Sequence, residues 1–167
     1  MRKENSLTDF QQFNPSKNDF PSTIWTSSEE ETFDLGKKIA RLLKKGSIVG
    51  LKGTLGAGKT CLARGIVSGL EVEEAVTSPS YTIVSEFRGF PYQTEPVPVY
   101  HIDAYRLNGS DDFSDLGGEE IVFGNGISII EWVERIPFFI IPGTIIIDME
   151  IIKDEKRLIR ITIEGMK

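Results

Sequence analysis

A glycine-rich segment that ends in a lysine and a threonine carries the clearest chemistry in the chain. Residues 53–60 read GTLGAGKT and match the pattern G-x-x-x-x-G-K-[ST] at every fixed position. Glycines let backbone N–H groups turn inward around a phosphate, where a Cβ would obstruct them. Lys59 offers a positive charge to the β- and γ-phosphates, and Thr60 offers a hydroxyl to Mg²⁺. The segment predicts a nucleotide-binding phosphate loop.

The flanks of this loop agree with that interpretation. The apolar run at 47–52 predicts a short buried strand, and CLARGIVSGL at 61–70 favours a helix whose positive dipole end points at the phosphates. A chance glycine-rich turn before a helix is the competing interpretation. Cys61 is expected to be a small packed residue that faces the sheet and is not catalytic. The loop residues expected to contact nucleotide are Gly53, Thr54, Leu55, Gly56, Ala57, Gly58, Lys59, Thr60 and Cys61.

A phosphate-loop enzyme also needs a carboxylate at the end of a neighbouring strand, where it holds Mg²⁺ or orients water. Asp103 and Glu131 both end apolar runs and lead into loops or helix starts, where sheet sites gather ligands. A helix cap or a surface ion pair is the alternative for either acid. We predict that Lys59, Asp103 and Glu131 are catalytic and that Thr60, Glu131 and Asp103 lie at the metal.

Asp148 follows three isoleucines in TIIID and looks most like the usual pattern of an apolar run ended by an aspartate, but the alternation around it argues against a role. In residues 144–152 one strand face is apolar, which leaves Asp148 and Glu150 together on the other face. The charged turn at 153–156 and the run at 157–163 then complete a hairpin. We therefore expect Asp148 on a half-solvated antiparallel strand. The apolar face consists of Ile145, Ile147, Met149 and Ile151.

The remaining patterns place further elements around the loop. A helix is predicted from TSSEEETF to Lys44–Gly46, with a capping box at Ser27/Glu30 or Ser28/Glu31. Extended runs at 81–88, 97–103 and 127–130 predict strands, and 110–116 predicts a short helix stopped by two glycines. Residues 1–24 are polar and are expected to be a flexible extension with little structure, although the phenylalanines at 10, 13 and 20 could dock. Residues 25–167 are expected to form one domain.

Composition excludes several classes of protein. With 19 Lys and Arg against 25 Asp and Glu, the net charge is −6, which is unfavourable for binding nucleic acid unaided. One cysteine and one histidine rule out an internal disulfide and disfavour a Cys/His zinc site. No apolar run approaches the roughly 20 residues of a membrane span, and the N-terminus has no apolar signal-peptide core. A soluble, cytoplasmic protein is expected.

Four segments in order, GTLGAGKT, TSPSYTIV, YHIDAYRL and IIEWVER, resemble the TsaE (YjeE) family. The resemblance covers about residues 25–165 and is most specific in the last three segments. It implies an α/β fold, a three-layer P-loop NTPase-like architecture with a mixed central sheet and a C-terminal antiparallel hairpin. It also implies ATP and Mg²⁺, weak ATPase activity in tRNA threonylcarbamoyladenosine modification, and a TsaD–TsaB partner complex that the ATP cycle resets. The tRNA would be held only indirectly, through the partners.

The resemblance also assigns residues. Asp103 and Glu131 match the two acidic positions of the family, and Trp132 matches a neighbouring tryptophan expected near the nucleotide. Ser80 stands where the family usually has Thr, so the hydroxyl is retained. The segment expected to act as a γ-phosphate-sensing switch contains Thr77, Ser78, Ser80 and Thr82.

Three alternatives remain open from the sequence. A small-molecule P-loop kinase is the first, but Arg88, Arg106 and Arg135 are scattered and form no arginine-rich lid. An ATP-loaded adaptor whose hydrolysis is not essential is the second. A vestigial loop is the third, and the intact lysine, hydroxyl and acids argue against it.

Overall fold

The computed structural model describes residues 7–16, 20–73, 83–92 and 94–166. Its strands are β1 (Leu7–Asp9), β2 (Ser22–Thr26), β3 (Ile48–Gly53), β4 (Val84–Gly89), β5 (Val97–Asp103), β6 (Ile127–Glu131), β7 (Ile145–Lys153) and β8 (Lys156–Ile163). Its helices are α1 (Glu29–Ala40), α2 (Lys59–Gly69), α3 (Ser110–Asp115), α4 (Gly118–Val122) and the 3₁₀ turns η1 (Val133–Arg135) and η2 (Pro137–Phe139). None of the helices in these ranges is long and apolar enough to cross a bilayer.

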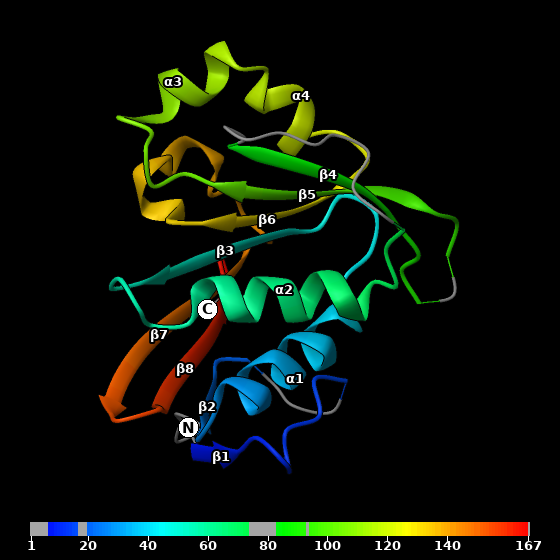
Figure 1. The fold of residues 1–167 in the computed structure, drawn as a ribbon. Coiled ribbons are helices and arrows are strands. Elements are labelled where there is room, and N and C mark those ends of the chain that lie inside the picture. The colour runs from blue at the N-terminus through cyan, green and yellow to red at the C-terminus, as the bar shows by residue number, and fades with distance from the viewer. Residues whose placement is uncertain (1–6, 17–19, 74–82, 93, 167) are drawn as a thin grey trace.

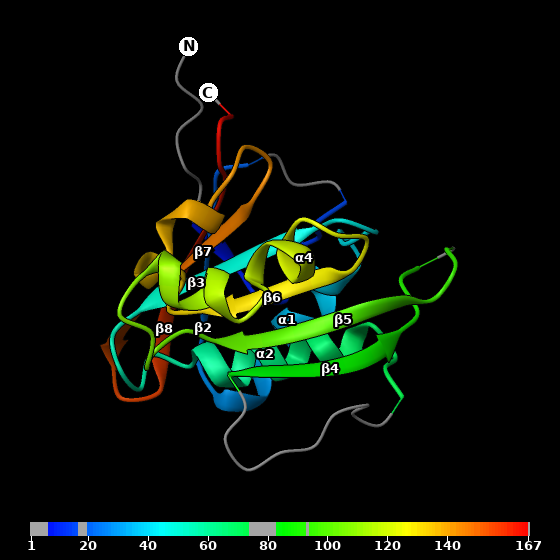
Figure 2. The same ribbon diagram turned by 90° about the horizontal axis from the view of Figure 1, so that it is seen from above.

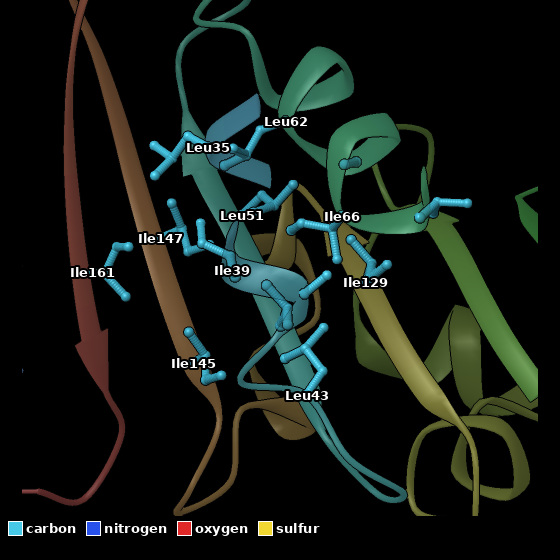
Figure 3. Packing of buried hydrophobic residues seen from close by; sticks show 14 of the residues in the cluster. Leu35, Ile39, Leu43, Leu51, Leu62, Ile66, Ile129, Ile145, Ile147 and Ile161 are labelled. Atoms are coloured by element: carbon cyan, nitrogen blue, oxygen red, sulfur yellow. The ribbon is translucent and has the colours of Figure 1, made fainter. Parts of the chain in front are cut away.

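The strands form one mixed sheet in the order β1-β2-β8-β7-β3-β6-β5-β4, with helices on both faces (Figures 1 and 2). The face covered by α1 and α2 holds the larger apolar core, and α3, α4, η1 and η2 close a second core on the other face. Figure 3 shows side chains of α1 and α2 directed toward those of β3, β6 and β7. The predicted three-layer α/β architecture with a mixed sheet is confirmed.

The middle of the sheet is parallel, and this is what assembles the site. β3 pairs in parallel with β6 and β7, and β6 pairs in parallel with β5. The carboxyl ends of these strands therefore meet at one edge, where β3 leads into the phosphate loop. Asp103 and Glu131 are register partners across β5 and β6, so the two acids stand side by side at that edge.

The C-terminal hairpin is confirmed, but its first strand is not half-solvated along its whole length as the sequence predicts. β7 pairs antiparallel with β8 and also in parallel with β3, so it is an interior strand of the sheet. Ile145, Ile146 and Ile147 are all buried because both faces of the sheet are covered there. Half-solvation begins only beyond this point, and Asp148 is exposed as predicted.

The expectation of little structure in residues 1–24 is wrong for the described part of that segment. β1 pairs with β2, and β2 pairs with β8 at the edge of the sheet. Phe10 and Phe13 are only 6% and 2% exposed and belong to the larger core. Lys38 of α1 fixes this segment by donating from Nζ to the carbonyls of Phe10 (2.8 Å) and Phe13 (3.2 Å). The docking alternative is the one the structure supports.

The structure differs from the sequence prediction at two helices. α1 begins as predicted, since the side chain of Ser28 accepts a hydrogen bond from the N–H of Glu31, but it ends at Ala40 rather than at Lys44–Gly46. Single turns continue through Leu43, which keeps that side chain buried. α4 was not predicted, because its glycine start reads as a helix stop.

α1 and α2 approach closely at glycines, so the two helices pack tightly against each other on one face of the sheet. A Cβ on Gly65 would collide with the backbone carbonyl of Phe33. We expect Gly65→Ala to destabilise the fold by about 2 kcal/mol. Overpacking against the backbone should cost about 3 kcal/mol, the upper end of its usual range. Alanine recovers roughly 1 kcal/mol of this because it is the better helix former. Ser68→Ala, an exposed position on the same helix, should stay within about 0.5 kcal/mol of wild type. Urea unfolding of both variants measures the difference, and equal midpoints would contradict the close packing.

Candidate nucleotide-binding site

The phosphate loop connects β3 to α2 and has the backbone conformation that its glycines permit. Gly53, Gly56 and Gly58 have φ values of 138°, 80° and 100°. A Cβ on Gly53 would collide with the carbonyl of Met149 on β7, so the loop lies directly against that strand. The N–H of Ala57 donates to the carbonyl of Thr54 at 3.1 Å and closes the turn. The loop therefore wraps a concave space at the N-terminus of α2.

Lys59 lies across the loop and is 4% exposed. Its Nζ donates to the carbonyls of Gly53 (2.6 Å) and Thr54 (2.8 Å) and lies 3.9 Å from the ring centroid of Trp132. Burial lowers the pKa of Lys59, although the negative charges of Glu134, Glu131 and Asp103 act in the opposite direction. The Lys59 ammonium is thus held by backbone carbonyls at the edge of the cavity that the loop encloses.

Glu131 makes two short hydrogen bonds, one to Thr60 at the end of the loop and one to a neighbouring strand of the sheet. Its Oε1 accepts from the hydroxyl of Thr60 at 2.6 Å, and its Oε2 lies 2.6 Å from Nε2 of His101 on β5. Burial by itself raises the pKa of Glu131, but these bonds and the charges of His101 and Lys59 outweigh burial, so the pKa is lowered. Glu131 is therefore a carboxylate at neutral pH although it is only 4% exposed.

Asp103 ends β5 beside Glu131 but is exposed to solvent. Its Oδ1 accepts a hydrogen bond from the N–H of Tyr105 at 3.1 Å, which orients the carboxylate. The N–H of Ala104 donates to the carbonyl of Glu131 at 3.0 Å and ties the two strand ends together. The structure brings both predicted acids to the edge of the sheet that carries the loop.

Trp132 forms the wall of the site opposite the loop. It has a left-handed backbone conformation with a φ of 58°, which turns the chain sharply after Glu131. Its ring packs against Tyr105 at 4.9 Å, and the Arg135 guanidinium lies over both rings, at 5.9 Å from Trp132 and 5.1 Å from Tyr105. A cavity of about 440 Å³ is lined by Trp132, Lys59, Thr60 and Glu131 together with Leu55, Gly56 and Gly58.

Cys61 lines the same cavity. It faces α1, whereas the sequence analysis predicted that it faces the sheet. Its Sγ donates to the carbonyl of Glu29 at 3.3 Å. Burial raises the pKa of the thiol, with a further contribution from the charge of Glu29. A raised pKa keeps the thiol in its less nucleophilic, protonated form, and the absence of a catalytic role for Cys61 stays a prediction.

The switch residues Thr77, Ser78, Ser80 and Thr82 lie outside the described residues. Sequence reasoning missed His101 and Arg157 as neighbours of the site. His101 precedes Asp103 by two residues, so strand alternation puts both on the face that meets α2. That spacing was the available signal for His101, whereas Arg157 comes from the distant hairpin and had no local signal.

The residues at the loop fit Mg²⁺ bound together with a nucleotide. Mg²⁺ prefers oxygen ligands and is commonly held by one or two carboxylates, water and substrate phosphates. The Thr60 hydroxyl and a Glu131 carboxylate oxygen lie 2.6 Å apart at the floor of the cavity, and the chemistry of this pair suits such an ion. Within the described ranges, no cluster of three or more His, Cys, Asp or Glu side chains forms a purely protein-made metal site.

Comparison with known proteins identifies the family. The family model described as "Threonylcarbamoyl adenosine biosynthesis protein TsaE" matches residues 26–160. The chain is 37% identical over 134 residues to the tRNA threonylcarbamoyladenosine biosynthesis protein TsaE of Treponema pallidum, covering 80% of this chain and 95% of the relative. Identity to the protein of the same name from Aquifex aeolicus is 40% over 136 residues, covering 80% of this chain and 90% of that one.

A solved structure agrees with the sequence comparisons. The crystal structure of Bacillus subtilis YdiB superimposes with a TM-score of 0.66 and 29% identity, covering 89% of this chain and 90% of YdiB. The matched region contains the phosphate loop, both strand-end acids and Trp132. The chain belongs to the TsaE family of threonylcarbamoyl adenosine biosynthesis proteins.

Proposed function

We propose that this protein binds ATP with Mg²⁺ and hydrolyses it slowly, and that its ATP cycle resets a TsaD–TsaB complex during tRNA threonylcarbamoyladenosine modification. The single observation that carries the proposal is the hydrogen bond between Thr60 at the end of the phosphate loop and Glu131 at the end of the adjacent strand. It joins a phosphate-binding element to an ionised carboxylate, which is the pairing that phosphoryl transfer to water requires.

Each residue has a defined task in this proposal. The loop from Gly53 to Lys59 binds the phosphates through backbone N–H groups, and the Lys59 ammonium moves from the carbonyls of Gly53 and Thr54 to the β- and γ-phosphates. Thr60, Glu131 and Asp103 hold the metal, which when bound neutralises negative charge on the transferring phosphoryl group.

The acids also act on the attacking water. Glu131 or Asp103 orients it, and His101 keeps Glu131 fixed by its hydrogen bond to Oε2. Trp132 covers one side of the bound nucleotide from across the cavity. The switch segment from Thr77 to Thr82 is proposed to sense the γ-phosphate through its hydroxyls.

The proposed partners follow from family membership and from charge. A TsaD–TsaB-like complex would make the modified adenosine, and with a net charge of −6 this chain would contact tRNA only through that complex. A cytoplasmic location is proposed with it.

The test is steady-state ADP release from MgATP, measured with and without a cognate TsaD–TsaB complex. Slow release by the protein alone and clear acceleration by the complex is the expected result. Normal nucleotide binding with no acceleration would contradict partner-coupled hydrolysis. ADP formation that depends on an added metabolite would instead identify a kinase, and normal multiple turnover by a hydrolysis-deficient variant would identify an adaptor.

A further inference from the structure

Arg157, on the C-terminal hairpin, contacts the outside of the phosphate loop. Its Nε donates to the carbonyl of Ala57 at 3.1 Å, and its Nη2 lies 3.5 Å from the carbonyl of Gly56. Its Nη1 donates to the carbonyl of Asp154 in the hairpin turn at 2.9 Å. The guanidinium therefore ties the turn between β7 and β8 to the loop, and Figure 1 shows this turn on the same side of the molecule as the loop.

We propose that Arg157 is a positioning residue that holds the phosphate loop in its binding conformation. The C=O and N–H groups of one peptide unit point in nearly opposite directions. When Arg157 binds the carbonyl of Ala57 from the hairpin side, the N–H of Gly58 is directed to the opposite side, where the cavity is lined by Gly58, Lys59 and Thr60. Inward-pointing N–H groups are what a phosphate loop uses to bind phosphate.

The loop needs an external support because its own sequence provides little rigidity. Gly56 and Gly58 both have positive φ values and the conformational freedom of glycine. A planar guanidinium with donors in a fixed fork restrains two adjacent carbonyls at once, which a lysine ammonium cannot do with the same geometry. Arg157 itself is held in place because β8 pairs with both β7 and β2 at this residue, opposite Ile151 and Thr26.

This inference rests on the proposed nucleotide binding and adds a residue outside the nucleotide pocket. The competing explanation for any effect of Arg157 is its positive charge, which would attract phosphate through space. The two explanations differ in two measurable ways. If Arg157 acts through its charge, a lysine at this position keeps the nucleotide affinity, and the contribution of the residue falls as salt is added. If Arg157 positions the loop, the forked guanidinium is required and its contribution does not depend on salt.

The experiment measures the dissociation constant of a fluorescent ADP analogue with Mg²⁺ for the full chain and for Arg157→Lys and Arg157→Ala, at low and high salt. Loss of charge-assisted hydrogen bonds that preorganise the loop predicts about tenfold weaker binding for both variants at both salt concentrations. Arg160→Ala is the matched control, since Arg160 lies on the same strand, is exposed and pairs with Glu150 at 3.3 Å. The Arg160→Ala variant should bind the ADP analogue with wild-type affinity.

A second measurement separates positioning from general destabilisation of the hairpin. Hydrogen exchange of the backbone amides is measured for the wild type and the Arg157 variants below the melting temperature. We expect the variants to exchange faster only within residues 53–60. Wild-type affinity in Arg157→Lys, or a defect of Arg157→Ala that disappears at high salt, would overturn the inference while leaving nucleotide binding intact. If the wild-type chain does not bind the analogue, the proposed function fails, and this inference fails with it.

Discussion

Replacement of Lys59 by alanine is expected to weaken binding of MgATP and MgADP by about 100-fold. Lys59 is the one cation whose Nζ lies within the phosphate loop among the described residues, bound to the carbonyls of Gly53 and Thr54. Removing a buried, hydrogen-bonded charge from a contact with an anion costs about 3 kcal/mol, which corresponds to this loss of affinity. Isothermal titration with each nucleotide measures it directly.

The control for this variant is Lys45→Ala. Lys45 is exposed beyond the end of α1 and away from the phosphate loop, and it carries the same charge. A loss of affinity shared by both variants would mean that net charge, and not the local contact, attracts the nucleotide. Unchanged affinity in Lys59→Ala would support the vestigial-loop alternative and remove the basis for an ATP cycle.

The parts of the site that local sequence determines were predictable. The phosphate loop is a contiguous segment whose backbone conformation depends on glycines at fixed spacing, so its residues identify it without tertiary information. Asp103 and Glu131 were predicted because each ends an apolar strand, and parallel strands bring such ends to one edge. Both predictions use only neighbours along the chain.

The parts that depend on contacts between distant segments were not predictable in the same way. Phe10 and Phe13 show no periodicity that predicts burial, and what holds their segment is Lys38, more than twenty residues further along the chain. The hydrogen bond from His101 to Glu131 requires β5 to lie beside β6, and strand order is not encoded in either strand alone. Arg157 reaches Ala57 from 100 residues away.

The parallel neighbour of β7 was missed for a related reason. The alternation of residues 145–151 correctly predicts which side chains share a face, but both faces of the sheet are covered where β7 begins, so Ile146 is buried as well. The pattern of one strand does not reveal what packs on its other face. Only the segment from Ile147 to Glu150 alternates between buried and exposed side chains as the sequence predicts, and Ile151, which was expected on the apolar face, is exposed.

Glu131→Gln is expected to reduce ATP hydrolysis by a factor of about 100 to 1,000 while nucleotide affinity changes by less than tenfold. Glutamine keeps the shape of the side chain, and its amide oxygen can still accept the hydrogen bond from Thr60. It removes the negative charge that lies next to Thr60 and Lys59, and this charge is what the proposed role at the metal and the attacking water requires.

Asp148→Asn provides the matched control, because it also neutralises an acid at the end of an apolar run. Asp148 is exposed on β7 and does not line the cavity, so this variant should hydrolyse ATP at the wild-type rate. Single-turnover measurements of ADP formation, with affinity measured separately, distinguish loss of chemistry from loss of binding. If Asp148→Asn is inactive and Glu131→Gln is not, the assignment of the acids is reversed. If Glu131→Gln loses hydrolysis but still supports repeated turnover of a TsaD–TsaB complex, the protein acts as an ATP-loaded adaptor, since binding alone then satisfies the partners.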